Sequence, residues 1–170
     1  MTIHDGFPFP TDEDPVRRLR GRLGGQVSLW TTGSGADRAG LTISSLLVVG
    51  GEPALVIGAI DPDSDLADEI EVGSTAVVQL LSWQQRDLAE AFAGTAPAPG
   101  GPFRRASWRD TAWGPRAEEA TAWAGVRVRS LEPQGWSLLV TADIEQVELG
   151  DDTAGGGPLL HRRGRYRREA

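Results

Sequence analysis

The 170-residue sequence contains no cysteine, no lysine and only two histidines. The absence of cysteine excludes a disulfide framework and any thiolate-based metal or redox chemistry. The absence of lysine excludes Schiff-base catalysis and a phosphate-binding loop of the GxxxxGK(S/T) type. The histidines, His4 and His161, are too few for a histidine-rich metal site, and no GxSxG sequence is present to hold the nucleophile of a catalytic triad. We therefore predict a protein without a metal site and without triad chemistry.

The sequence also lacks long apolar runs, and its net charge is −7. No stretch of about 18 apolar residues is present to span a membrane, and residues 1–25 lack the apolar core of a signal peptide. We therefore expect a cytoplasmic protein that does not bind membranes. The negative charge argues against general nucleic-acid binding, because contacts to phosphate dominate that affinity. The exception is the tail HRRGRYRREA, whose five arginines allow three interpretations: a solvated terminus, a site for RNA or an acidic partner, or contacts to the phosphate of a small cofactor.

Periodicity predicts a mainly β fold with three short helices. The helices are expected at 14–22, 64–73 and 82–94, each with a capping residue at its start. Six segments rich in β-branched and apolar residues predict strands, at 26–31, 41–49, 54–60, 75–81, 120–131 and 137–149. Because these strands do not alternate with helices, a small barrel or sandwich is favoured over a doubly wound sheet. We expect one domain, with an N-terminal arm and helix at 1–25 and a barrel at 26–170.

Two of these strands carry further detail. The continuous apolar run ALVIGAI, at 54–60, predicts a strand that is buried on both faces. In the last long strand, the apolar positions are even-numbered up to Ile144 and odd-numbered from Val147. A one-residue slip moves side chains to the other face of a sheet, so we predict a bulge or sharp bend near Glu145–Gln146.

A hydroxyl-rich segment, RAGLTISS at 38–45, is the most distinctive polar feature. Local hydrogen bonds to the backbone explain most hydroxyls at strand ends, and the alternative is a strand end that holds a ligand. The acidic segment DPDSDLADE at 61–69 lacks the glycine and glutamate that a calcium loop needs at its sixth and twelfth positions, which favours a helix cap. With so little acid–base machinery, the sequence suits an enzyme whose chemistry belongs to a cofactor.

The order of these segments resembles that of the flavin reductase-like family of FMN-binding split barrels. The resemblance runs from about Val27 to Tyr166 and is most specific in GLTISS and in QLLSWQQRDLAEAFAG. Its other parts are, in order, VSLWTTG, the apolar strand ending IDPDS, WGP, AWAGVRV, TADIEQVEL and PLLHRRGRY. The resemblance implies a split β-barrel of six or seven strands with a few short helices, and it implies a homodimer.

The resemblance also implies a binding site. The segment that contains GLTISS would line the flavin ring, the segment at 61–66 would meet the ribityl chain and phosphate, and Arg38 would be a phosphate partner. The implied flavin contacts are Arg38, Thr42, Ile43, Ser44, Ser45, Asp61, Ser64, Asp65 and Leu66. The residues implied on the nicotinamide side are His161, Arg165 and Tyr166.

The implied activity is hydride transfer from NADH or NADPH to FMN or FAD, with the reduced flavin supplied to a partner monooxygenase. Such chemistry needs two rings in near-attack geometry more than an acid or a base, so no catalytic side chain is expected. The sequence departs from the family pattern in its acidic phosphate-side segment and in Gly135-Trp136-Ser137, where many relatives have Gly-Asp-His near the nicotinamide. Two alternatives stay open: a barrel that binds flavin, haem or deazaflavin without nicotinamide turnover, and a non-enzymatic interaction barrel.

Overall fold

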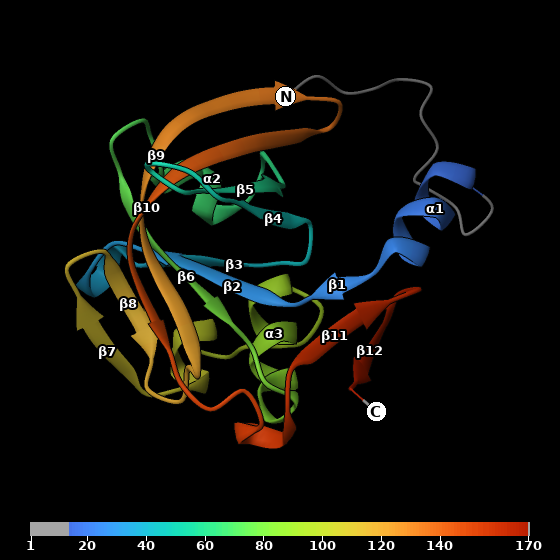
Figure 1. The fold of residues 1–170 in the computed structure, drawn as a ribbon. Coiled ribbons are helices and arrows are strands. Elements are labelled where there is room, and N and C mark those ends of the chain that lie inside the picture. Colours follow the sequence, from blue (N-terminus) through green and yellow to red (C-terminus); the bar gives the residue numbers. More distant parts are fainter. Residues whose placement is uncertain (1–13, 170) are drawn as a thin grey trace.

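The computed structural model describes residues 14–169, and its largest element is a curled antiparallel sheet of seven strands (Figure 1). The strands are β2 Ser28–Thr32, β3 Ala39–Ile43, β4 Leu46–Val49, β5 Leu55–Ile60, β6 Thr75–Leu80, β9 Ala122–Gln134 and β10 Ser137–Leu149. Their order across the sheet is β3-β2-β6-β9-β10-β5-β4. The mainly β prediction is therefore confirmed.

The sheet must curl because its two edge strands are neighbours in the chain. β3 and β4 lie at opposite ends of the strand order, yet only Ser44 and Ser45 connect them. Two residues span at most about 7 Å, so the two edges of the sheet have to meet at this point. The backbone N–H of Ala59 in β5 donates to the carbonyl of Ser45 at 2.9 Å, which ties the connection to the strand next to β4. We call this connection the Ser44–Ser45 corner.

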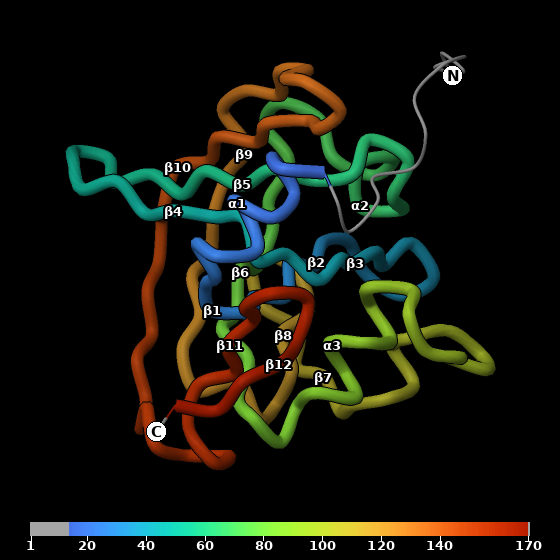
Figure 2. The backbone as a smooth tube through the Cα atoms, turned by 90° about the vertical axis from the view of Figure 1, so that its right-hand side faces the viewer, coloured from blue at the N-terminus to red at the C-terminus, as the bar shows by residue number. Residues whose placement is uncertain are grey.

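Two smaller sheets and short helices complete the molecule. A three-stranded sheet consists of β1 Gly25–Gln26, β11 Leu159–Arg162 and β12 Arg165–Arg168, and a hairpin consists of β7 Trp108–Thr111 and β8 Gly114–Ala117. The α-helices are α1 Pro15–Leu23, α2 Asp65–Glu69 and α3 Arg86–Ala93, and short 3-10 turns are η1 Gly35–Asp37, η2 Trp83–Gln85, η3 Pro102–Arg105 and η4 Ala154–Gly156. Figure 2 shows α1 beside β1, with β11 and β12 next to them, on one side of the barrel. None of the described helices is long and apolar enough to cross a membrane.

The core consists of two apolar clusters. One fills the barrel and includes Trp30, whose ring packs so closely on Gly58 that a Cβ there would lie 2.8 Å from the ring atom Cη2. α2 contributes Leu66 to the same cluster. The other cluster lies between the barrel and α3, where Leu88 and Phe92 pack with residues of β2 and β11. The barrel cluster contains Ile43 and has Leu46 packed against it, so it holds both ends of the Ser44–Ser45 corner.

All three predicted helices are present, with some changed bounds. Asp14 caps α1 and Ser64 caps α2, each through a side-chain oxygen that accepts from a backbone N–H. α2 ends at Glu69, earlier than the predicted 73. Ser82 and Gln85 form the predicted capping box, but a 3-10 turn precedes α3, which ends at Gly94 in a left-handed conformation. The predicted arm at 1–13, which contains His4, lies outside the described residues.

Two strand predictions need correction. The segment 41–49 is not one strand, because the chain passes at the Ser44–Ser45 corner from one edge of the sheet to the other. The segment 54–60 is not buried on both faces: Val56 and Ile60 are buried, whereas the side chains that alternate with them in β5 are partly exposed. The predicted bulge is confirmed by a register shift between Ile144 and Gln146 in the pairing of β10 with β9.

Several short strands were not predicted. These are β1, β7, β8, β11 and β12. Most of the arginine-rich tail belongs to β11 and β12, which pair antiparallel, so this part of the chain forms a hairpin. The side chains of Arg165, Arg167 and Arg168 are nevertheless exposed.

Candidate functional site

A cavity of about 790 Å³ opens where α1, the Ser44–Ser45 corner and the turn between β11 and β12 meet. Figure 1 places these three parts on the same side of the barrel. Ligand pockets commonly have volumes of about 300–1,000 Å³, so this cavity has the size of a cofactor site. The residues that line it are Arg17, Arg18, Arg20, Gly21, Arg22, Leu23, Gly24, Ser44, Ser45, Leu46, His161, Arg163 and Gly164. We call it the arginine-lined cavity.

The Ser44–Ser45 corner is held rigidly behind the cavity. The hydroxyl of the fully buried Ser28 donates to the carbonyl of Ile43 at 2.7 Å and accepts from the indole Nε1–H of Trp30 at 3.0 Å. The Ser45 carbonyl is bonded to β5 on the other side of the corner. Ser44 is half-buried and Ser45 is exposed, and both line the cavity. The corner therefore presents two serines from a backbone that is fixed at both ends.

Thr42 and Ile43 are placed differently from the two serines. The Thr42 hydroxyl donates to the carbonyl of Ala89 in α3 at 2.6 Å, and the Ile43 side chain is buried in the barrel core. Neither residue lines the cavity. Of the four residues predicted to contact the flavin ring, the structure brings Ser44 and Ser45 to the cavity, and the flavin contact itself stays a prediction.

Four arginines of α1 and one of the β11–β12 turn supply the positive wall of the cavity. The helix is docked through backbone groups: the Arg163 N–H donates to the Gly21 carbonyl at 2.9 Å, and Arg162 Nε donates to the Arg22 carbonyl at 3.3 Å. A Cβ at Gly21 would lie 3.5 Å from the Arg163 Cα, so the two backbones are close. Arg163 has a φ of 54°, a left-handed conformation that is uncommon outside glycine.

His161 reaches the cavity from β11, directly opposite Gly25 of β1. Burial, together with the positive charge of Arg20, lowers the pKa of its imidazole. Its neighbour on β12 is Tyr166, whose ring lies 5.8 Å away in an edge-to-face arrangement and whose pKa is raised by burial and by Glu90. Of the three residues predicted on the nicotinamide side, only His161 lines the cavity.

The predicted phosphate segment at 61–66 lies away from the cavity, and its polar groups are used locally. The Ser64 hydroxyl donates to the Asp61 carbonyl at 2.7 Å and accepts from the Ala67 N–H at 3.2 Å. An Asp61 carboxylate oxygen accepts from a backbone N–H of the same turn, Asp65 is exposed, and the Leu66 side chain is fully buried. The helix-cap interpretation of this acidic segment is supported by these bonds, and its phosphate contact stays a prediction.

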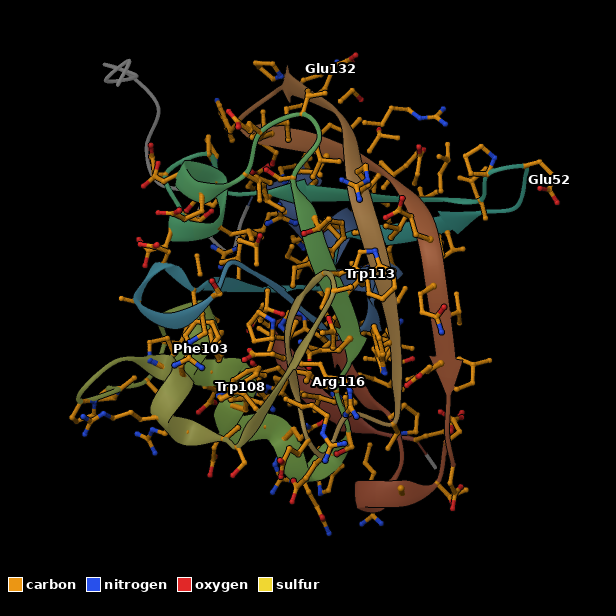
Figure 3. The ribbon with its side chains drawn as sticks, turned by 90° about the vertical axis from the view of Figure 1, so that its left-hand side faces the viewer. Glu52, Phe103, Trp108, Trp113, Arg116 and Glu132 are labelled. Atoms are coloured by element: carbon orange, nitrogen blue, oxygen red, sulfur yellow. The ribbon has the colours of Figure 1, made fainter. Side chains whose placement is uncertain are left out.

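Arg38 directly precedes β3 and does not line the cavity. Its Nε donates to the Gly35 carbonyl at 3.1 Å, and its guanidinium lies 4.5 Å from the centre of the Phe103 ring. Figure 3 shows Phe103 next to Trp108, whose ring centre is 4.8 Å away. Arg38 is thus held by an aromatic cluster, and its role as a phosphate partner stays a prediction.

Comparison with known proteins identifies the family. The family model described as "Flavin reductase like domain" matches residues 20–170. The chain belongs to this family. It is 30% identical over 143 residues to the NADH:FMN oxidoreductase of Rhodococcus qingshengii, with 84% of this chain and 74% of the relative covered. It is 28% identical over 156 residues to the reductase component of 4-hydroxyphenylacetate 3-monooxygenase of Thermus thermophilus, with 92% and 96% covered.

A solved structure supports the fold of this flavin reductase-like chain. The NADH:FAD oxidoreductase SgcE6 of Streptomyces globisporus, in complex with NAD and FAD fragments, superimposes with a TM-score of 0.79 at 22% identity. The match covers 96% of this chain and 98% of that one. The split-barrel prediction is therefore confirmed.

Sequence reasoning missed the main charged wall of the site in this flavin reductase-like chain. The arginines at 17, 18, 20 and 22 belong to the helix predicted at 14–22, and no part in a site is predicted for them from the sequence. One signal was available: all 17 basic residues are arginine, and four of them fall within six residues of a predicted helix. The Gly135-Trp136 pair, by contrast, forms the turn between β9 and β10 and does not line the cavity.

Proposed function

We propose that the protein is an NAD(P)H-dependent flavin reductase that transfers hydride from the nicotinamide to FMN or FAD. The observation that carries this proposal is the rigid Ser44–Ser45 corner opening into a cationic cavity of cofactor size. Two relatives of the same family are named for NADH-dependent flavin or monooxygenase reductase activity, which supports the same assignment. We infer a cytoplasmic location, which the lack of cysteine suits.

The residues of the corner fit the polar edge of a flavin ring. That edge carries ring nitrogens and carbonyl oxygens, and a serine hydroxyl can donate to or accept from either kind of atom. Ser44 and Ser45 would hold this edge, while Thr42 and Ile43, fixed to α3 and to the core, keep the strand from moving. When bound, the flavin supplies the hydride acceptor, so the chain itself has to position rings rather than move protons.

His161 would form the nicotinamide side of the site. It lines the same cavity as the two serines, and its lowered pKa favours the neutral imidazole near neutral pH, which can contact a ring without adding a charge. Tyr166 packs against His161 and would fix its orientation. Arg165, on the exposed side of β12, would meet a more distant part of the co-substrate.

The test is oxidation of NADH and of NADPH, followed at 340 nm with FMN, FAD or riboflavin as acceptor. We expect turnover with at least one pair, and we expect the Ser44→Ala/Ser45→Ala variant to raise the KM for flavin. The exposed Ser107, replaced by alanine, is the matched control and should leave the KM unchanged. Absence of turnover in every pair would refute the reductase proposal, and a yellow protein without turnover would favour a binding barrel.

We further propose a homodimer that supplies reduced flavin to a monooxygenase. Apolar side chains of α1 and β4 face solvent: Val16 is 73% exposed, Leu19 63% and Val48 68%. An amphipathic helix normally covers its apolar side, and a second subunit would do so here. Light scattering should give twice the mass of an 18.2 kDa chain, and Leu19→Glu should shift it towards monomer, whereas Arg109→Glu on the distant β7 should not.

A further inference from the structure

The arginine-lined cavity has the opposite charge from the protein as a whole. The chain carries a net charge of −7, yet five arginines and one histidine line this cavity. Among the described residues, none that lines the cavity is an aspartate or a glutamate. A cleft lined by charges of one sign attracts ligands of the opposite sign, so this cavity is suited to an anionic ligand.

The orientation of α1 supports the same conclusion. Arg17, Arg18, Arg20 and Arg22 all line the cavity, while Val16 and Leu19 do not line it and are mostly exposed. Surface helices ordinarily place their apolar stripe towards the protein and their charges towards water. Arg18 and Arg22 are also four residues apart, a spacing at which like charges destabilise a helix. The helix therefore presents exposed arginines at the rim of the cavity.

Hydrogen bonds between α1 and the β11–β12 hairpin fix the position of the arginines that line the cavity. The helix is tied by the Arg163 N–H to the Gly21 carbonyl and by Arg162 to the last turn, and the left-handed backbone at Arg163 lets the β11–β12 turn approach it. Arg163 and Gly164, both with positive φ, are the two loop residues of the β11–β12 hairpin, and tight turns of this kind require that conformation. The turn therefore places Arg163 opposite the arginines of the helix.

We propose that the arginine-lined cavity binds the diphosphate of the nicotinamide dinucleotide, an inference that rests on the proposed reductase function. Guanidinium groups bind phosphate oxygens through paired, charge-assisted hydrogen bonds. The cavity joins this cationic wall to His161 and to the Ser44–Ser45 corner, so a dinucleotide whose diphosphate lies on α1 can extend its nicotinamide towards the flavin edge. The flavin phosphate is the other source of the same chemistry, and the experiment separates the two.

The direct test is calorimetric titration with ADP-ribose, the part of NAD that carries the diphosphate but cannot transfer hydride. The variant Arg18→Gln/Arg20→Gln keeps good helix formers and should bind ADP-ribose about tenfold more weakly, because each lost charge-assisted bond is a substantial part of the affinity. Arg109→Gln, which removes a positive charge from the exposed strand β7, is the matched control and should bind normally. A rise from 0.05 to 0.5 M salt, about a threefold fall in Debye length, should weaken wild-type binding.

Kinetics with riboflavin as acceptor provide the second arm, since riboflavin has no phosphate. In Arg18→Gln/Arg20→Gln the KM for NADH should rise, while kcat and the KM for riboflavin stay unchanged.

A rise in the KM for FMN with an unchanged KM for NADH would assign the cavity to the flavin phosphate and overturn the proposal. Equal ADP-ribose affinity in wild type and variant would overturn it too, even if NADH oxidation proceeds. Arginine-dependent ADP-ribose binding without oxidation of either NADH or NADPH would instead support the cavity assignment and refute the reductase function. Circular dichroism of each variant verifies the fold, and Arg163→Gln is the second variant should the helix change unfold α1.

Discussion

Replacement of Ser28 by alanine should destabilise the barrel and loosen the Ser44–Ser45 corner together. The Ser28 side chain is fully buried, donates to the Ile43 carbonyl and is the acceptor for the Trp30 indole N–H. A buried donor left without a partner costs about 1–3 kcal/mol, and the lost bond to the carbonyl adds about 1 kcal/mol. We therefore expect the free energy of unfolding to fall by about 2–4 kcal/mol.

Urea unfolding measures this loss. With a slope of about 1–3 kcal/mol per molar for small proteins, the midpoint of Ser28→Ala should fall by about 1–2 M, whereas the exposed Ser107→Ala should stay within about 0.5 kcal/mol of wild type. Introducing Ser28→Ala into a Trp30→Phe background isolates the indole bond, because the phenyl ring has no N–H to leave unpaired. There the cost should fall by about 1 kcal/mol or more.

Ser28→Ala should also affect flavin binding. Since the Ser28 hydroxyl fixes the carbonyl directly before the corner, Ser28→Ala should raise the KM for flavin, and Ser107→Ala should not. A stability loss below about 0.5 kcal/mol, or an equal loss in the Trp30→Phe background, would refute the assignment of the buried hydroxyl as the element that holds the corner.

Two further predictions concern close packing and titration. Gly58→Ala puts a methyl group 2.8 Å from the Trp30 ring and should lower stability by about 1–3 kcal/mol, whereas Gly50→Ala, where a Cβ meets open space, should be nearly neutral; equal melting temperatures would contradict the packing argument. The pKa of His161 is held below its ordinary value of 6.5 by burial and by Arg20, so the unfolded chain takes up a proton first and stability is lost as pH falls through 6.5 towards the folded value. Titration by NMR should give a midpoint below 6.5 that rises in Arg20→Gln, and a midpoint unmoved by that change would exclude the arginine as a cause.

Much of the barrel was predictable because its long strands alternate clearly. In β9, Val126 and Val128 are buried while Arg127 and Arg129 are exposed, and the phase change in β10 gives the observed bulge near Glu145. The short strands were missed for the converse reason. Segments such as RYRR in β12 and GPRA in β8 have too few apolar residues for a period of two to be visible, and they form because neighbouring backbone supplies their hydrogen bonds.

The break between β3 and β4 could not be predicted from local strand propensity, for a different reason. The residues at 41–49 have continuous strand propensity, and nothing local marks Ser44 as a corner. The break follows from closure of the sheet, which requires its two edges to meet at this connection, and from the bond between the Ser45 carbonyl and β5. Propensity describes a single segment, whereas closure depends on all seven strands.

The residues of the candidate site also differ in how far they could be predicted from the sequence. The serines of the corner were predicted from the family resemblance in the order of segments, because the hydroxyl-rich motif alone also fits an ordinary strand end. The arginine wall was not found, because its position depends on the pairing of Gly25 with His161 in strands from opposite ends of the chain. That pairing, together with the bonds from Arg162 and Arg163 to α1, brings the arginines of α1 to the β11–β12 turn.

The proposed binding sites for the flavin ring and for the nicotinamide dinucleotide differ in how closely they are connected to the core. The corner that would hold the flavin ring is bonded to buried residues of the barrel, so changes that weaken it also weaken the fold. Most of the arginine wall lies on α1, which buries none of its described side chains and accepts hydrogen bonds from Arg162 and Arg163. Substitutions there remove charge without opening the core. Affinity for the nicotinamide co-substrate can therefore change independently of flavin binding and of stability, which is why the arginine variants provide a clean separation between the two binding steps.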